Sequence, residues 1–303
     1  MDQSIQKALR KAKLKQLLKI AVVSVFVSML LLIGINRLGN YITSIHHKNL
    51  HERLFLAQAI TQPNVDIDSQ VTANSSMFGG NIVTNRSKNI NGYLVPWSTL
   101  TSSYSWFGAS IDYNELIPGY FSQGATEYEY DKQTKQKVAT FYHPAIKKYY
   151  DGVQNQLPEL VQMKDHVAEV AISFKEPMTM DEVKNSIPDN LNIVWLYMAS
   201  KVGDESMGPL GLPVYGYADS ELSEEGFDSF IEVLKEYDED KTDETIQDYI
   251  KQNEQKPFNK VTVLGVMLTG KTESFEGLLG RDFVRGASVG VTVPTVSYIK
   301  TVK

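Results

Sequence analysis

One segment of the sequence matches the pattern of a phosphate-binding loop. Residues 265–272 read GVMLTGKT, so Lys271 and Thr272 stand where such a loop places its phosphate-binding lysine and its magnesium-binding hydroxyl. A phosphate loop, however, turns its backbone amides inward around the phosphates. The apolar letters between Gly265 and Gly270 instead continue a strand, and the segment after Thr272 is too short for the acidic magnesium-binding strand of a nucleotide-binding sheet. We therefore expect a strand, a turn at Gly270 and a helix capped by Thr272, without nucleotide binding.

A second segment matches the pattern around a nucleophilic serine. Residues 286–290 read GASVG, with Ser288 at the centre, as in the nucleophile elbow of α/β-hydrolases. That arrangement needs a histidine later in the chain, whereas the last histidine here is His166. Ser4 and Lys7 also fit a Ser-x-x-Lys pattern, but nothing around them forms a substrate pocket. We predict no catalytic residue, and a chain that is not an enzyme.

Histidines one helical turn apart suggest a metal site. His47 and His51 have the spacing that places two imidazoles on one helix face, with His46 and Glu52 beside them. Two ligands are too few for a zinc site without a donor from elsewhere in the chain. The alternative is a solvated helix whose histidines titrate near neutral pH.

An acidic segment resembles the start of a calcium-binding loop. Asp238, Asp240 and Glu244 follow the ligand spacing, but Asp243 occupies the position that requires glycine and Tyr249 the position that requires glutamate. A charged connection between two helices is the simpler interpretation. We predict neither a metal site nor a cofactor.

Aromatic side chains gather in the segment between Tyr93 and Phe121. Exposed aromatics there would suit stacking on a glycan or enclosing a peptide, whereas buried ones would form the core of a small β-rich unit, which is the interpretation we favour. The aromatic residues are Tyr93, Trp97, Tyr104, Trp106, Phe107, Tyr113, Tyr120 and Phe121.

These candidates follow an N-terminal segment with the features of a membrane anchor. Residues 20–35 are uncharged and apolar, which gives about 24 Å of helix at about 1.5 Å per residue. Snorkelling of Lys19 and Arg37 extends the span toward the bilayer thickness of about 30 Å, and we place the transmembrane helix at 20–37. The arm before it, residues 1–19, carries Lys7, Arg10, Lys11, Lys13, Lys15 and Lys19. By the positive-inside rule the arm is cytoplasmic and the C-terminal domain is extracytoplasmic, in a single-pass protein of the cell membrane.

Other properties of the sequence agree with this topology. A cleaved signal peptide is the rival interpretation, but the leading arm is long and no small-x-small cleavage site follows the apolar run. The formal net charge is −6, and because the arm has six basic residues and one acidic residue, the remainder carries −11. That charge argues against a nucleic-acid partner outside the membrane. The absence of cysteine excludes disulfides and thiolate metal sites.

The region after the span divides into three parts. Apolar residues at mostly helical spacing predict a stalk helix over 38–62, which Pro63 ends. Residues 63–125 are rich in Ser, Thr, Asn, Gly and aromatics without a helical period, and we expect short strands and loops there. Two strands over 127–130 and 138–142 flank a polar turn and predict a hairpin.

The part from 126 to 303 is predicted to be an α+β domain. Strands over 166–174 and 191–199 flank a helix that opens at Thr179 with a capping box. The same order recurs in a strand over 260–268, a short helix over 272–279 and a strand over 285–293. Two strand-helix-strand units predict a ferredoxin-like sheet with helices on one face. An insertion over 200–259 separates them, with a Gly/Pro loop and two helices, the first of which has an apolar stripe of Phe227, Phe230, Ile231, Leu234 and Tyr237.

Alternation in the second of these strands predicts that it is buried on both faces. Leu191, Ile193, Trp195 and Tyr197 are expected on one face, and Val194, Leu196 and Met198 on the other.

Several stretches resemble the sigma-factor-regulator family of Gram-positive bacteria. The resemblance to its C-terminal region lies in Phe141 to Pro144 (FYHP), Tyr149 to Gly152 (YYDG), residues 157–174 (LPELVQMKDHVAEVAISF) and residues 187–198 (IPDNLNIVWLYM). The basic arm, the single span and residues 93–97 (YLVPW) resemble its N-terminal region. Together these stretches extend over most of the chain.

The resemblance implies a membrane-anchored negative regulator, of the anti-sigma type, of an extracytoplasmic-function sigma factor, with an outer domain that senses or scaffolds. The arm of 19 residues is too short for a folded sigma-binding domain, and the cysteine ligands of zinc-type anti-sigma domains are missing. The sigma factor is therefore contacted directly by the arm or through a second membrane protein. The alternative function is an extracytoplasmic module that binds cell-wall glycan or peptide without a sigma factor.

Overall fold

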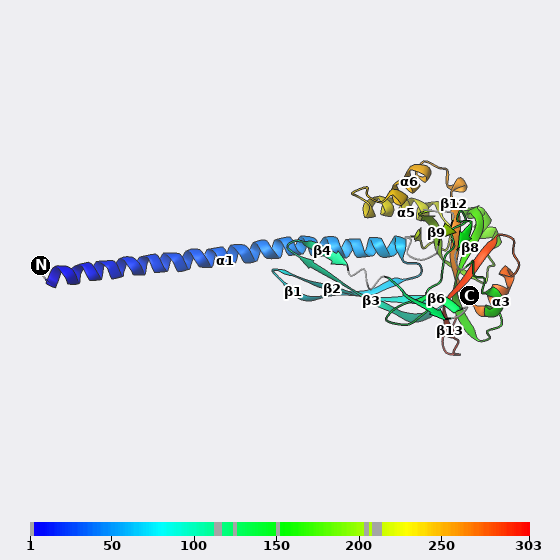
Figure 1. Ribbon diagram of the computed structural model, residues 1–303, viewed down its shortest axis with the longest axis horizontal. Coiled ribbons are helices and arrows are strands. Elements are labelled where there is room, and N and C mark those ends of the chain that lie inside the picture. The colour runs from blue at the N-terminus through cyan, green and yellow to red at the C-terminus, as the bar shows by residue number, and fades with distance from the viewer. Residues whose placement is uncertain (1–2, 112–116, 124–125, 150–151, 203–205, 208–213) are drawn as a thin grey trace. The chain divides into compact units, whose positions relative to one another are not determined.

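The computed structural model describes residues 3–111, 117–123, 126–149, 152–202, 206–207 and 214–303 of the chain (Figure 1). They form two compact units. The first unit contains Met1–Leu50, Thr72–Asn81 and Ser103–Ser110, and the second contains His51–Val71, Ile82–Ser102 and Ile111–Lys303. The structure is thus a mixed α and β protein that begins with one long helix. Tyr113 and Tyr150, together with most of the Gly/Pro loop of the insertion, lie outside the described residues.

Helix α1 (Gln3–Thr61) is continuous over 59 residues. Each of its residues up to Leu38 is exposed, and its apolar run is long enough to cross a membrane. Gly39 begins a buried stripe that continues through Thr43, Leu50 and Leu54 at the spacing of one helix face. The helix ends just before Pro63, because a proline disfavours helical geometry in the residue before it.

Four strands follow α1 and form one sheet in the order β1-β2-β3-β4. They are β1 (Asp66–Ser76), β2 (Gly79–Ile90), β3 (Tyr93–Ser105) and β4 (Gly108–Ile111). Two-residue loops join them. Asn91 and Gly92, between β2 and β3, have φ angles of 52° and 98°, as a type I′ hairpin turn requires. The expected β-rich segment is therefore a meander of hairpins.

The C-terminal region is mostly an antiparallel sheet in the order β11-β9-β12-β8-β13. Its strands are β8 (His166–Thr179), β9 (Asn192–Ser200), β11 (Val214–Tyr217), β12 (Thr262–Lys271) and β13 (Val284–Pro294). The smaller elements are β5 (Gly119–Gln123), β6 (Thr126–Tyr130), β7 (Lys148–Tyr149), α3 (Leu157–Leu160), β10 (Ser206–Met207) and the 3₁₀ helices η1 (Phe258–Lys260) and η2 (Thr272–Leu278).

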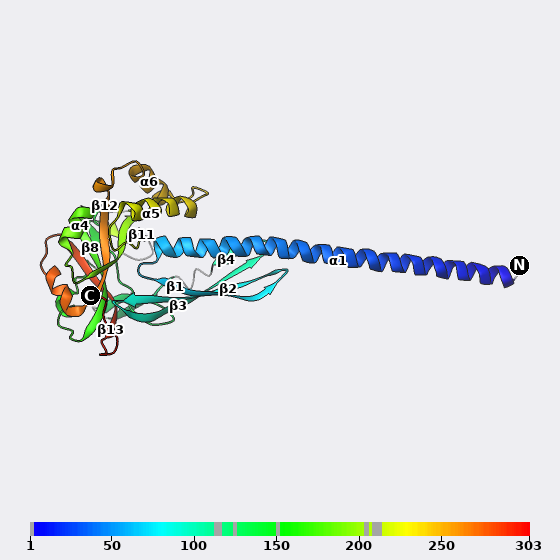
Figure 2. The ribbon, with the colours of Figure 1, turned by 180° about the vertical axis from the view of Figure 1, so that it is seen from behind.

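Helices cover one face of this sheet. Helix α4 (Met180–Ser186) begins with the expected capping box, in which Glu182 N donates to Thr179 Oγ1 and Thr179 N donates to the Glu182 carboxylate. Helices α5 (Glu224–Tyr237) and α6 (Glu244–Asn253) of the insertion pack against each other (Figure 2). The stripe of α5 is buried in the main core together with β8, β9 and β12, and Tyr237 is half-buried beside it.

Strand β9 differs from simple alternation. The register between β9 and β12 shifts where Met267 pairs with Trp195 and Leu268 pairs with Ile193, which leaves Val194 as an extra residue. Ile193 consequently packs into the helix-covered core, whereas Trp195 packs on the opposite face of the sheet. The prediction that Ile193 and Trp195 share a face is therefore wrong, while burial on both faces of β9 is confirmed.

Two further predictions are corrected by backbone pairing. Strand β6 pairs with β5, and residues 138–142 form no strand. Only a single bridge, Tyr130 to Lys137, remains of the expected hairpin among the described residues. Gly270 lies inside β12 opposite Ala168 and turns no chain, and the short helix after it is a 3₁₀ helix.

Candidate functional site

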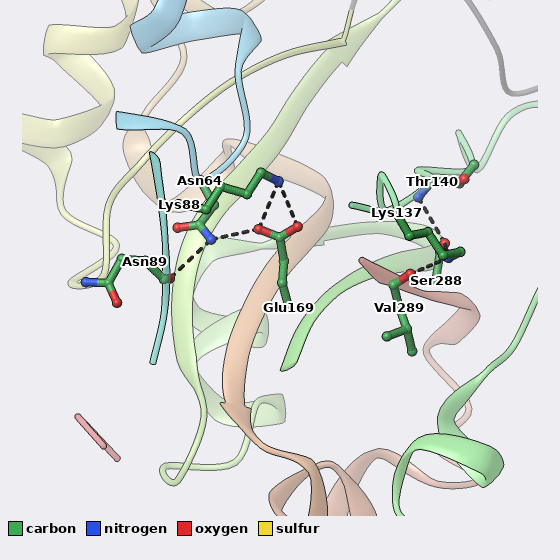
Figure 3. Close-up of polar contacts among 8 residues, drawn as sticks. All are labelled: Asn64, Lys88, Asn89, Lys137, Thr140, Glu169, Ser288 and Val289. Carbon is green, nitrogen blue, oxygen red and sulfur yellow. Dashed lines mark hydrogen bonds and ion pairs between the residues drawn. The ribbon is translucent and has the colours of Figure 1, made fainter. Parts of the chain in front are cut away.

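A buried ion pair lies on the face of the C-terminal sheet that the helices leave free. Glu169 of β8 is fully buried, and its carboxylate accepts hydrogen bonds from Lys88 Nζ at 2.8 and 3.0 Å (Figure 3). Asn64 Nδ2 donates to the same carboxylate at 2.7 Å and to the carbonyl of Asn89 at 3.2 Å. We call Asn64, Lys88 and Glu169 the polar cluster.

The polar cluster is tightly enclosed. The side chain of Lys88 is 4% exposed, and its ammonium lies 4.3 Å from the centre of the Trp97 ring, where a cation is attracted by the ring face. Removing both charges from water is costly and is offset only by close pairing and further hydrogen bonds. The cluster has both, so each charge depends on the other for its place in the interior.

A second buried contact lies on β13. Lys137 Nζ donates to Ser288 Oγ at 3.2 Å and to the carbonyl of Val289 (Figure 3). It also donates to Gln156 Oε1 at 3.1 Å. Burial lowers the pKa of Lys137 to about 8, an effect that the nearby Glu169 carboxylate partly opposes. The hydroxyl of Ser288 also accepts a hydrogen bond from the backbone of Thr140 at 3.0 Å.

This serine and lysine have a structural role. Ser288 is fully buried in the middle of β13, so the nucleophile-elbow pattern falls on an extended strand and not on a strand-to-helix turn. Ser173 of β8 similarly accepts a hydrogen bond from the backbone of Tyr142 at 2.8 Å. The two serines hold residues 138–142 against the sheet, which explains why this segment forms no hairpin.

A cavity of about 460 Å³ adjoins the polar cluster, and Asn64 belongs to both. Its size falls in the range of small-molecule sites. Six side-chain amides line it beside apolar and acidic residues, and we therefore call it the amide cavity. The amides are those of Gln58, Gln62, Asn64, Asn89, Asn91 and Asn192, and Trp195, Asp66 and Asp219 also line it.

Some polar groups of the amide cavity are engaged and others are available. Asn91 is engaged, because its side chain donates to the carbonyl of Lys303 and accepts from Asn192 Nδ2 at 2.9 Å and from the backbone of Val302 and Lys303 at 3.1 Å. The side-chain oxygen of Asn192 and the side-chain nitrogen of Asn89 have no protein partner among the described residues. The buried indole N–H of Trp195 is likewise unpaired within the described part of the chain. Such groups suit a ligand with uncharged donors and acceptors.

The structure places the phosphate-loop match in a strand. Residues 265–271 belong to β12 and pair with β8 on one side, so their amides cannot encircle a phosphate. Thr272 caps no helix, because its hydroxyl donates to the carbonyls of Met163 and His166. The continuation of the strand through the apolar letters is confirmed, and the capping role of Thr272 is wrong.

The histidine and carboxylate candidates have other partners. Within the first unit, His47 Nε2 lies 2.9 Å from Thr72 Oγ1 and its ring meets Tyr104 edge to face. Asp238 accepts hydrogen bonds from the backbone of Thr242 and from Gln247, and Asp243 caps α6. No group of three metal-ligating side chains occurs among the residues that the structure describes.

The aromatic residues of the segment 93–121 divide between core and surface. Tyr93 and Tyr104 are buried, whereas Phe107 is 98% exposed and Tyr120 is also exposed. The core interpretation therefore holds for part of the set.

The polar cluster was not found from sequence. Glu169 is the one charged residue in the apolar stretch 167–174 (VAEVAISF) of β8, and this is the signal that marks it. Its partner Lys88 lies 81 residues earlier, in a polar segment whose only other basic residue is Arg86, and no sequence pattern connects Lys88 with Glu169.

The described residues combine one long apolar helix with a mostly antiparallel sheet, and the comparisons assign the family. A family model described as sigma factor regulator N-terminal matches residues 6–95, and one described as sigma factor regulator C-terminal matches residues 160–291. No curated protein and no solved structure matches the chain.

The two matches together include more than half of the sequence, and the chain belongs to the sigma-factor-regulator family. The resemblance seen in the sequence is thereby confirmed at the level of the family.

Proposed function

We propose that this protein is a membrane-anchored negative regulator, of the anti-sigma type, of an extracytoplasmic-function sigma factor in a Gram-positive bacterium. The observation that carries the proposal is the pair of family matches, of which the first includes the apolar part of α1. The protein acts without enzymatic activity, through its contacts. Its partners are the membrane and the sigma factor, the latter reached by the short arm or through a second membrane protein.

The outer domain is proposed to sense or to scaffold. Lys88 lies in the N-terminal family region and Glu169 in the C-terminal one, so the polar cluster links the two regions.

We propose that the sheet is a ferredoxin-like variant, because β9-β12-β8-β13 is the order expected for two interleaved strand-helix-strand units, with β11 added at one edge. Residues 1–19 would be the arm, 20–37 the span, 38–62 the stalk, 63–125 the β-rich segment and 126–303 the outer α+β domain with its insertion.

The proposed orientation has a direct test. Six basic residues precede the span, so the arm should stay in the cytoplasm and everything beyond the span should be outside. Protease added to intact protoplasts is expected to digest the chain beyond residue 61 and to spare an N-terminal tag. Protection of the C-terminal region until the cells are lysed would reverse the orientation. Replacing Lys11, Lys13, Lys15 and Lys19 by glutamate should produce a mixed orientation.

The amide cavity favours a second candidate function, an extracytoplasmic module that binds cell-wall glycan or peptide. Its side-chain amides and the indole N–H of Trp195 are uncharged donors and acceptors, which suit the hydroxyls and acetamides of a glycan or the backbone of a peptide, and the carboxylates of Asp66 and Asp219 add acceptors. The full chain in detergent is expected to bind a neutral N-acetylglucosamine trisaccharide or a neutral tripeptide in calorimetry. Asn192→Ala should weaken that binding roughly fivefold, for a lost hydrogen bond of about 1 kcal/mol. If titrating either ligand into the full chain gives the same heat as titrating it into buffer, the cavity does not bind these ligands and the second candidate function is wrong.

A further inference from the structure

Two hairpin tips in the first unit present exposed aromatic side chains. The loop between β1 and β2 lies in residues 76–79 (SMFG), and the loop between β3 and β4 lies in residues 105–108 (SWFG). Phe78 is 62% exposed and Phe107 is 98% exposed. Phe78 also packs against the ring of Trp106, with ring centres 5.8 Å apart. The two tips therefore form one aromatic surface, which we call the tip surface.

Both tips are built in the same way. In the first, the hydroxyl of Ser76 accepts a hydrogen bond from the backbone of Phe78 at 3.2 Å and donates to the carbonyl of Gly79 at 3.0 Å. Ser105 makes the equivalent two bonds in the second loop, at 3.2 and 3.4 Å. Each turn thus holds a phenylalanine in the same exposed position, although a large apolar group at a loop tip is unfavourable in water.

The tip surface is fixed against α1 at one defined level. Trp106 Nε1 donates to the carbonyl of Met77, and Asn36 Nδ2 of the helix lies 3.3 Å from Met77 Sδ. A Cβ atom at Gly39 would lie 2.6 Å from the Met77 carbonyl and 2.8 Å from the Trp106 ring. Glycine at position 39 therefore allows both tips to reach the helix.

That level coincides with the end of the apolar run. Gly39 follows Ile35 by four residues, or about 6 Å along the helix. The interfacial layer of a bilayer extends about 5 to 7 Å beyond each side of the hydrocarbon. Tyr41, which is exposed on the same stretch of α1, and Trp106 are the residue types that prefer this layer.

We propose that the tip surface binds the phospholipid interface of the membrane that α1 spans, with Phe78 and Phe107 inserted among the headgroups. The inference rests on the proposed membrane anchor and adds a second attachment to it. A lipid surface is the occupant because α1 brings it to this level in every molecule, whatever the protein's other partners. The tips would thereby hold both hairpins of the first unit at the bilayer.

The chain offers a clean test because it has no cysteine. An environment-sensitive fluorophore is attached to a single cysteine in full-length Phe107→Cys, reconstituted in single-chain phosphatidylcholine nanodiscs. Val25→Cys, in the span, is the reference for a probe in lipid. Asn49→Cys is the reference for a probe in water, because Asn49 is exposed and lies about 15 Å beyond Gly39 along α1. Because the side chain of Phe107 is 98% exposed, we expect its replacement to leave the folding of the chain unchanged.

We expect the emission of the probe at position 107 to be blue-shifted and to be quenched by lipids that carry a nitroxide at the headgroup. Iodide in the water should quench this probe several-fold less than the probe at position 49. A probe at 107 as sensitive to iodide as that at 49, with the probe at 25 in lipid, would overturn the inference and leave the anchor intact. If the probe at 25 is also in water, the proposed anchor fails as well. Lipid-like emission seen only in crowded vesicles, and lost in single-chain nanodiscs, would assign the tip surface to a second copy and overturn the inference.

Discussion

Replacing Lys88 by methionine is expected to lower the free energy of unfolding by about 3 to 5 kcal/mol, because it leaves the fully buried carboxylate of Glu169 without its counterion. This is a large part of the roughly 5 to 15 kcal/mol that typically stabilises a folded protein. The measurement is a thermal melt of the full chain in detergent. The full chain is needed, since Lys88 and Asn64 lie before residue 126 and pack against Glu169.

A double variant provides the matched control. In Lys88→Met combined with Glu169→Gln no buried charge remains, and the side-chain amide at position 169 can still accept the hydrogen bond from Asn64. We expect this variant to recover most of the stability that the single variant loses. If the single and double variants melt at the same temperature, the ion pair is not what makes Lys88 important.

Replacing Trp195 by alanine is expected to cost about 3 to 5 kcal/mol as well, for a different reason. Its side chain is 2% exposed and packs in a cluster with Phe141, Tyr197 and Met267 on the face of the sheet that carries the polar cluster. Removal of the indole leaves a large hole that this rigid sheet cannot close. The melting temperature and the amount of folded protein in the membrane should both fall, and any loss of regulation should follow that fall.

Trp195→Phe separates packing from recognition. Phenylalanine fills most of the space but lacks the N–H that is unpaired beside the amide cavity. We expect this variant to melt close to wild type and to regulate normally if Trp195 only fills the core. Normal melting with loss of regulation would instead make Trp195 part of a ligand site.

The strands and helices of the C-terminal region were predictable because their local patterns agree with their packing. Strand β8 alternates between buried faces, Thr179 and Glu182 form a capping box, and α5 buries the stripe that its spacing indicates. The register shift at Val194 was not predictable, because a bulge depends on the partner strand and leaves no mark in the sequence of β9 alone.

The candidate site was less accessible to sequence reasoning than the fold. The pairing of Lys88 with Glu169 and of Lys137 with Ser288 joins residues 81 and 151 positions apart, and such contacts depend on the tertiary arrangement. The phosphate-loop pattern is a false match, since residues 265–272 fit the motif but residues 265–271 lie in a strand paired with β8. The sequence shows that the hairpin loops contain aromatic residues, but it does not show that these loops contact α1 at Gly39.

The proposed negative regulation of a sigma factor is tested most directly by RNA sequencing of cells that lack this protein. We expect the transcript levels of a set of genes that share one promoter sequence to rise in the deletion strain and to return to the wild-type level when the full chain is restored. If no set of genes with a common promoter rises, or if such a set falls, the protein is not a negative regulator of a sigma factor.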